Sequence, residues 1–143
     1  MALTGDQLIN SWVNFWNEKD TDQINHLYAD NAVFEDVAEG ATYEGLSAIK
    51  QCLIDDISFA PDIKVEIISI LVSENQGVLE WRWSGTQTGD ISGLMPATDK
   101  KFSIRGITLF EFRNNKIVKQ SDYYNAATFL YQLGVKFEFP NKE

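Results

Sequence analysis

Apolar residues in the first part of the chain recur at the spacing of a helix. Within residues 4–20, Leu8, Trp12 and Phe15 fall on one face of a helix with 3.6 residues per turn. Thr4 stands at the start of this segment, and threonine is a residue type that caps helix N-termini. The same spacing predicts further helices at residues 21–28, 46–58 and 125–133.

Elsewhere the apolar positions alternate with polar ones, which is typical of strands with one buried face. The clearest case is residues 100–113, where an apolar or small residue occupies almost every second position. Asn114 and Asn115 follow and favour a hairpin turn. Strands are predicted at residues 31–37, 41–43, 63–72, 77–88, 100–113 and 116–124.

The predicted order is helices, a short strand pair, a helix and then an antiparallel meander. This segregation of strands from helices favours an α+β fold over a doubly wound parallel sheet. No linker or repeat interrupts the chain, so we expect one domain over residues 1–143, with a core at 4–134 and a tail at 135–143. A strongly curved antiparallel sheet wrapped on N-terminal helices would leave a pocket between the two layers.

The net charge of the chain limits which classes of binding partner are expected. The 143 residues include 12 Lys and Arg against 21 Asp and Glu, a formal net charge of −9. Nucleic acids and anionic membranes are polyanions, so we expect neither as a partner. The N-terminus does not resemble a signal peptide, and no apolar run approaches the ~18 residues of a membrane helix. These features favour a cytoplasmic location.

Few residues are available for metal or nucleophile chemistry. Cys52 is the only cysteine and His26 the only histidine, so neither a disulfide nor a zinc site is expected. No phosphate-binding loop, dinucleotide fingerprint or nucleophile elbow is present. We therefore expect no cofactor and no metal, and any chemistry falls on carboxylates placed within apolar strands.

Asp122 is the leading candidate among these carboxylates. It shares a strand face with Gln120 and Tyr124, two residues to either side. In a partly dry aromatic pocket its charged form would be disfavoured, which would raise its pKa toward the range useful for acid/base catalysis. The alternative is a strand-end Asp that lies in water or caps the last helix.

Asp36 and Arg82 are further candidates, each with two interpretations. Asp36 shares a strand face with Phe34, but an Asp before a turn also commonly binds its own backbone. Arg82 lies between Trp81 and Trp83. It either faces inward and pairs with a carboxylate, or it faces outward while the two tryptophans line the pocket.

Several short strings of the chain occur in a recognisable order. In the first half they are LYADNAVFEDV and YEGLSAIKQCL. In the second half they are GTQTG (85–89), GLMPATDK (93–100), GIT (106–108), NKIVK (115–119) and QLG (132–134). In this order the strings resemble SnoaL-like polyketide cyclases of the nuclear transport factor 2 superfamily, which also includes ketosteroid isomerases and limonene epoxide hydrolases.

The resemblance implies a cone-shaped α+β barrel with a deep hydrophobic pocket, commonly a homodimer through the outer sheet face, without metal or organic cofactor. It implies that Asp122 is the acid/base that removes a proton next to a carbonyl. Asp36 and Arg82 would tune or orient it, and Thr108 would donate a hydrogen bond. Thr108 stands where the cyclases often have His, and Ser84 where the epoxide hydrolases have a second carboxylate.

The predicted function is a small-molecule cyclase or isomerase that acts on an apolar carbonyl compound, with an epoxide hydrolase less favoured. The alternative is a non-catalytic module that binds a small hydrophobic molecule or a protein. The residues predicted to contact the ligand are Trp16, Tyr28, Phe34, Met95, Phe110, Gln120 and Tyr124.

Overall fold

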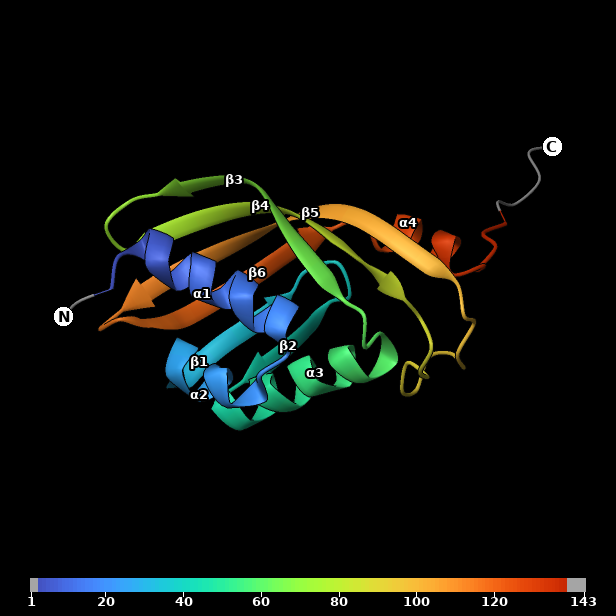
Figure 1. Ribbon diagram of the computed structural model, residues 1–143, viewed down its shortest axis with the longest axis horizontal. Coiled ribbons are helices and arrows are strands. Elements are labelled where there is room, and N and C mark those ends of the chain that lie inside the picture. Colours follow the sequence, from blue (N-terminus) through green and yellow to red (C-terminus); the bar gives the residue numbers. More distant parts are fainter. Residues whose placement is uncertain (1–2, 139–143) are drawn as a thin grey trace.

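The computed structural model describes residues 3–138 and has a helical layer and one curved sheet (Figure 1). The helical elements are α1 (Gly5–Glu18), the 3-10 turn η1 (Thr21–Gln23), α2 (Ile24–Leu27), α3 (Leu46–Phe59) and α4 (Ala126–Gln132). The strands are β1 (Tyr28–Asp36), β2 (Ala41–Glu44), β3 (Lys64–Val72), β4 (Gln76–Thr86), β5 (Lys101–Arg113) and β6 (Lys116–Tyr124).

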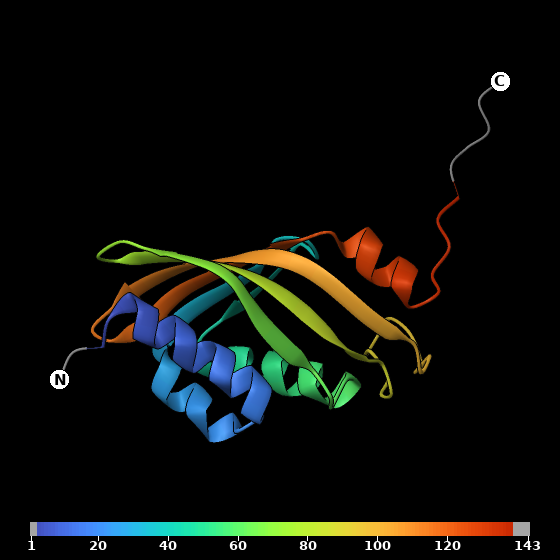
Figure 2. The ribbon, with the colours of Figure 1, turned by 45° about the horizontal axis from the view of Figure 1, so that its top comes forward.

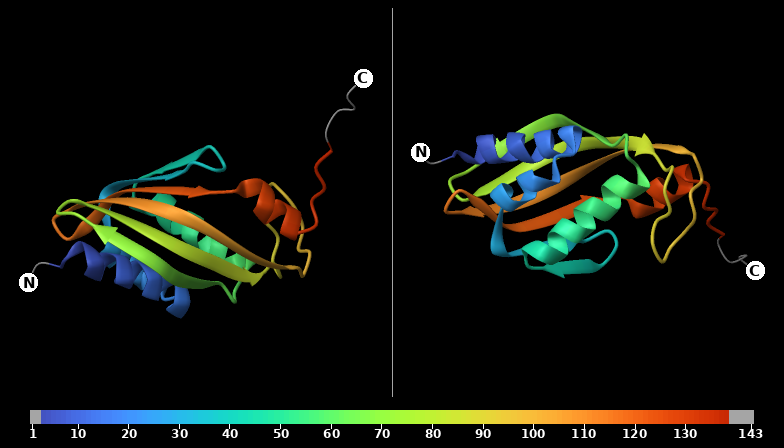
Figure 3. Two further views of the ribbon diagram at one scale, coloured as in Figure 1. Left: turned by 90° about the horizontal axis from the view of Figure 1, so that it is seen from above. Right: turned by 60° about the horizontal axis from the view of Figure 1, so that its bottom comes forward.

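The six strands form a single sheet in the order β2-β1-β6-β5-β4-β3. All neighbouring pairs are antiparallel except β1 and β6, which are parallel. Figure 2 shows α1, α2 and α3 beneath the concave side of the sheet, and the right-hand view of Figure 3 shows α1 and α3 crossing this same side. The predicted α+β class with a curved sheet is confirmed.

The predicted start of α1 is confirmed by a capping box. The Thr4 hydroxyl accepts a hydrogen bond from the Gln7 backbone N–H at 3.2 Å, and the Gln7 side chain accepts one from the Thr4 N–H at 2.9 Å. The buried face of the helix includes Trp12, whose ring meets that of Phe110 edge-on at 5.4 Å. This packing fixes α1 against the sheet.

The helix predicted at residues 21–28 is shorter than expected. It consists of η1 and α2, and Tyr28 already belongs to β1. Tyr28 is 1% exposed because it lies on the inner face of the sheet. Within residues 3–138, no helix is long and apolar enough to cross a membrane.

Gly106 in β5 allows an indole ring to lie directly over the strand. A Cβ at this position would lie 2.4 Å from Cη2 of Trp81 and 2.8 Å from the carbonyl oxygen of Tyr123. Because Gly106 has no side chain, the Trp81 indole crosses it and its Nε1 donates to the Thr108 hydroxyl at 2.8 Å. The glycine therefore permits the contact that organises Thr108.

We expect Gly106→Ala to displace the Trp81 indole and to lower the free energy of unfolding by about 1–3 kcal/mol, as overpacking usually does. Urea unfolding measures this loss. In a Trp81→Phe background the same substitution should cost less, because the two closest contacts, with the outer indole ring, are gone. Equal costs in both backgrounds would contradict this explanation.

Candidate functional site

A cavity of about 850 Å³ lies between the concave face of the sheet and helices α3 and α4. Its walls combine aromatic side chains with carboxylates. The aromatic residues are Trp12, Trp16, Phe34, Tyr43, Phe59, Trp81, Trp83, Tyr124 and Phe129. The acidic residues are Asp36, Glu39, Asp55, Asp56, Asp90 and Asp122, and no Lys, Arg or His within residues 3–138 lines the cavity.

The mouth of the cavity is formed by the segment between β4 and β5, including Asp90, Ile91 and Leu94. This segment is held by Gln87, which is fully buried. The Gln87 amide donates to the carbonyls of Gly89 (3.2 Å) and Pro96 (3.1 Å) and accepts from the Thr98 hydroxyl (2.6 Å). One buried amide thus fixes the segment over the cavity.

Asp122 lies in this cavity at the centre of a row across three strands. Thr108 on β5 and Asp36 on β1 are its direct register partners on either side. Asp122 Oδ1 accepts hydrogen bonds from the Thr108 hydroxyl at 2.7 Å and from the Gln120 amide at 3.0 Å. Among the described residues, none donates to Oδ2, so this oxygen is available to a ligand.

The pKa of Asp122 is raised from its ordinary 3.8 to about 7. Burial is the largest cause, since a dry environment disfavours the charged form. The bonds from Thr108 and Gln120 lower the pKa, whereas the nearby charges of Asp36 and Glu39 raise it. A carboxyl group with this pKa both accepts and releases a proton near neutral pH.

The two donors to Asp122 are themselves held in place from behind. Thr108 accepts from Trp81 Nε1, so its own proton is directed to the carboxylate. The Gln120 carbonyl accepts from the Tyr28 hydroxyl and from Trp12 Nε1 (3.3 Å), so its NH₂ group faces Asp122. These interior contacts fix the orientation of the carboxylate before any ligand arrives.

Two further carboxyl groups, those of Asp36 and Glu39, lie near Asp122. The Tyr124 hydroxyl is 2.9 Å from Asp36 Oδ2 and 3.3 Å from Glu39 Oε1, and it donates to one of them at a time. Asp36 Oδ1 accepts from the Glu39 backbone N–H at 3.0 Å. Burial raises the pKa of both carboxyl groups, and the charge of Asp36 further raises that of Glu39. Asp36 therefore both binds its own turn and faces the cavity.

Asp56 on α3 is a cavity residue that the sequence reasoning missed. Burial, then the charges of Glu39, Asp122 and Asp36, raise its pKa well above the ordinary value, which favours its protonated form. A signal was available: Asp56 lies four residues after Cys52 and three after Leu53, on the apolar face of α3. Burial also raises the pKa of the Cys52 thiol, so this side chain is not an activated nucleophile.

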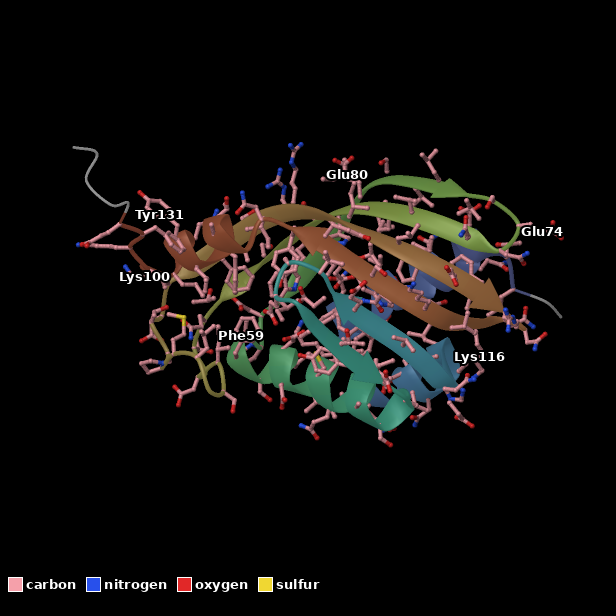
Figure 4. The ribbon with its side chains drawn as sticks, turned by 180° about the vertical axis from the view of Figure 1, so that it is seen from behind. Phe59, Glu74, Glu80, Lys100, Lys116 and Tyr131 are labelled. Atoms are coloured by element: carbon pink, nitrogen blue, oxygen red, sulfur yellow. The ribbon has the colours of Figure 1, made fainter. Side chains whose placement is uncertain are left out.

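The prediction that the Arg82 side chain faces into the pocket is wrong. Alternation along β4 buries Leu79 and Trp81 on the concave side, so Arg82 faces outward with Glu80, which points away from the helices in Figure 4. Its Nη1 donates to the Ser103 hydroxyl at 3.3 Å rather than to a carboxylate in the cavity. The alternative, in which the two tryptophans line the pocket, is the one that the structure shows.

The predicted ligand-contacting residues divide into two groups. Trp16, Phe34 and Tyr124 line the cavity. Four others do not line it: Tyr28, Met95, Phe110 and Gln120. Three of these four are buried beneath α1 and behind Asp122, where they pack or form hydrogen bonds, whereas Met95 is half-buried and its backbone pairs with that of Ile91 at the mouth.

No group of three His, Cys, Asp or Glu side chains within residues 3–138 is placed to hold a metal ion. The arrangement suits proton transfer: the Asp122 carboxyl group, with a pKa of about 7, lies in the same cavity as Asp56, whose raised pKa favours the protonated form. Two carboxyl groups whose environments give them different pKa values are a recurring feature of acid/base sites.

Residues 6–133 match the family model of the SnoaL-like polyketide cyclases, and the chain therefore belongs to this family. The family indicates a small-molecule function of the cyclase or isomerase type. No curated protein matches the chain.

Solved structures at low sequence identity share the fold. TsrD from Streptomyces laurentii superposes with a TM-score of 0.79 at 22% identity, covering 90% of this chain and 93% of that one. A hypothetical protein with a ketosteroid isomerase-like fold from Catenulispora acidiphila, solved in complex with trimethylamine, gives a TM-score of 0.77 at 22% identity, with coverages of 94% and 96%. A SnoaL-like polyketide cyclase from Agrobacterium tumefaciens gives 0.77 at 17% identity, with coverages of 92% and 99%.

Proposed function

We propose that the protein is a cofactor-independent enzyme that removes a proton next to a carbonyl group of an apolar small molecule. The observation that carries this proposal is the state of Asp122, which lines the cavity: its pKa is about 7, Oδ1 is held by two donors, and Oδ2 has no donor among the described residues. In its ionised form, Oδ2 takes the proton from the carbon. The electron pair of that C–H bond passes to the carbonyl, which becomes an enolate.

Asp56 is proposed to stabilise the enolate. Burial raises its pKa and favours its protonated form, and it lines the same cavity, so its O–H would donate to the oxygen on which negative charge develops. For isomerisation, Asp122 returns the proton to a different carbon. For ring closure, the enolate carbon forms a C–C bond with a second carbonyl carbon, and the new alkoxide takes the proton from Asp122. Neither route needs an oxidant or a reductant.

The proposal is tested by deuterium exchange of the carbon-bound protons of apolar cyclic ketones, beginning with 1-tetralone, followed by NMR in D₂O. We expect the protein to accelerate exchange and the rate to rise with pH through the pKa of about 7, because the base must be ionised. If ketones bind in the cavity but exchange is no faster than in buffer, the protein is a binding module and the proposal fails.

Asp56→Leu should lower the exchange rate by about 100-fold, the effect of removing one donor to a developing oxyanion. Asp56→Asn keeps an N–H donor and should lower it less. The matched control is Asp30→Asn, which changes an exposed carboxylate on β1 outside the cavity. An equal loss in the Leu and Asn variants would contradict the role of Asp56 as a donor.

We also propose a homodimer through the convex face of the sheet. Leu71 is 73% exposed, and Ile107 and Tyr123, which pair in register on β5 and β6, are 42% and 47% exposed. Apolar side chains grouped on one sheet face favour association. Sedimentation equilibrium should give twice the 16.2 kDa chain mass, and Ile107→Lys should give a folded monomer. A monomeric wild-type protein at 100 μM would contradict this proposal.

A further inference from the structure

Six acidic side chains line the cavity, and no Lys, Arg or His among the described residues lines it. The ion pair found in the described part of the chain, Lys64 with Glu66 at 3.0 Å, lies on β3 and outside the cavity lining. Buried carboxylates are usually paired with a cation, because isolated charges are costly to bury. Within residues 3–138, no basic side chain of the cavity lining is available to pair with the half-buried Asp36 and Asp122.

The Asp36–Glu39 pair shows where this imbalance is greatest. The two carboxyl groups share the single Tyr124 hydroxyl, which satisfies one of them at a time. A ligand that brings N–H donors and a positive charge would satisfy both groups at once. A neutral ligand would lack the charge that strengthens these hydrogen bonds, and an anionic ligand would be repelled by the two carboxylates.

Aromatic rings surround the same region. The Trp81 ring centroid lies 6.3 Å from that of Tyr124, and the Phe34 and Tyr43 rings stack at 5.5 Å on the neighbouring strands β1 and β2. Rings of this kind attract organic cations through their negative faces, and they exclude hydrated anions. Carboxylates combined with aromatic walls form a site suited to an ammonium group on an apolar body.

Trp16 gives an independent sign that a ligand belongs in this cavity. It lines the cavity, is 5% exposed, and its indole Nε1 is buried without a hydrogen-bond partner among the described residues. Buried donors are rarely left unpaired in native proteins. The ligand is therefore expected to carry an acceptor oxygen as well as a cation.

A further, chemical reason to expect a cationic ligand rests on the proposed function, in which Asp122 removes a proton from the substrate. Asp36 and Glu39 lie close enough for their charges to raise the pKa of Asp122, so they would also oppose the negative charge of an enolate. A cation on the substrate offsets this repulsion. We infer that the cavity takes a primary amine in its protonated form, a carbonyl-bearing organic cation whose ammonium group binds at Asp36 and Glu39.

The test uses three probes of one size and different charge: benzylammonium, benzyl alcohol and benzoate, titrated at pH 7.5 and followed by NMR of the protein backbone. We expect benzylammonium to bind at least about tenfold more tightly than benzyl alcohol, as one charge-assisted bond suggests. Benzoate should bind weakest. In the double variant Asp36→Asn/Glu39→Gln, benzylammonium and benzyl alcohol should bind equally.

The double variant Glu35→Gln/Glu44→Gln is the matched control, because it removes the same charge from exposed positions on β1 and β2 outside the cavity. It should keep the full preference for benzylammonium. No binding of benzylammonium, equal affinity for the three probes, or an equal loss of preference in both double variants would overturn the inference. Ketone exchange that depends on Asp122 would still stand in that case, so the two proposals fail separately.

Discussion

Asp122→Asn should slow the protein-catalysed exchange of ketone protons by about 100- to 10,000-fold, the usual contribution of a general base. The reason is local, because an Asn side chain keeps an oxygen that accepts from Thr108 and Gln120 but has no basic oxygen for the proton. The shape of the cavity and the affinity for the ketone should therefore change little. Exchange rates and binding constants, measured on the same samples, separate the two effects.

The control for this prediction is Glu35→Gln, which removes one negative charge from the exposed side of β1. It should leave the exchange rate unchanged. If Asp122→Asn exchanges ketone protons as fast as the wild-type protein, Asp122 is not the base. A loss of ketone binding together with exchange would instead assign Asp122 to the recognition of the ligand.

The same substitution should stabilise the protein against unfolding. Folding raises the pKa of Asp122 from 3.8 to about 7, mainly through burial. The folded state therefore holds this proton more tightly than the unfolded chain, and stability present below pH ~4 is lost as pH rises toward 7. The loss amounts to at most about 4 kcal/mol, since three pKa units correspond to about 1.4 kcal/mol each. Asn does not titrate, so the Asp122→Asn protein does not undergo this loss of stability.

Urea unfolding of both proteins between pH 4 and 8 tests this expectation. The free energy of unfolding of Asp122→Asn should exceed that of the wild type by an amount that grows from pH 4 to 7 and is constant above. Asp62→Asn is a control in which the effect on stability should have the opposite pH dependence, because folding lowers the pKa of Asp62. Burial raises the Asp62 pKa, but the Thr86 N–H (2.7 Å) and hydroxyl (2.8 Å) outweigh this and lower it. A pH-independent difference for Asp122→Asn would contradict the raised pKa.

The local elements were predictable because their signals lie within a few residues of one another. The Thr4 cap and the alternation of β5 are short-range patterns, and both are present in the structure. Asp122 was identified in the same way, from its strand face shared with Tyr124. The sequence pattern did not decide which face of β4 carries Arg82. Large residues stand at both the odd and the even positions of this strand, so either set could have faced the cavity.

The composition of the cavity depends on contacts that no short window contains. Asp36 lies beside Asp122 because β1 pairs in parallel with β6, about 85 residues later in the chain. Asp56 comes from the opposite layer, so its burial depends on how α3 packs over the sheet. Phe110 and Tyr28 share the inner face with the cavity residues, but α1 covers that part of the sheet. Strand parity alone does not distinguish a covered position from an open one.

The proposed chemistry depends on Asp122 being a carboxyl group that titrates near neutral pH inside the cavity. The direct measurement is the ¹³C shift of its side-chain carboxyl carbon as a function of pH in the unliganded protein, assigned by its absence in Asp122→Asn. We predict a midpoint near 7. A midpoint near the ordinary value of 3.8 would contradict it, because Asp122 would then be ionised throughout and too weak a base for the proposed proton transfer.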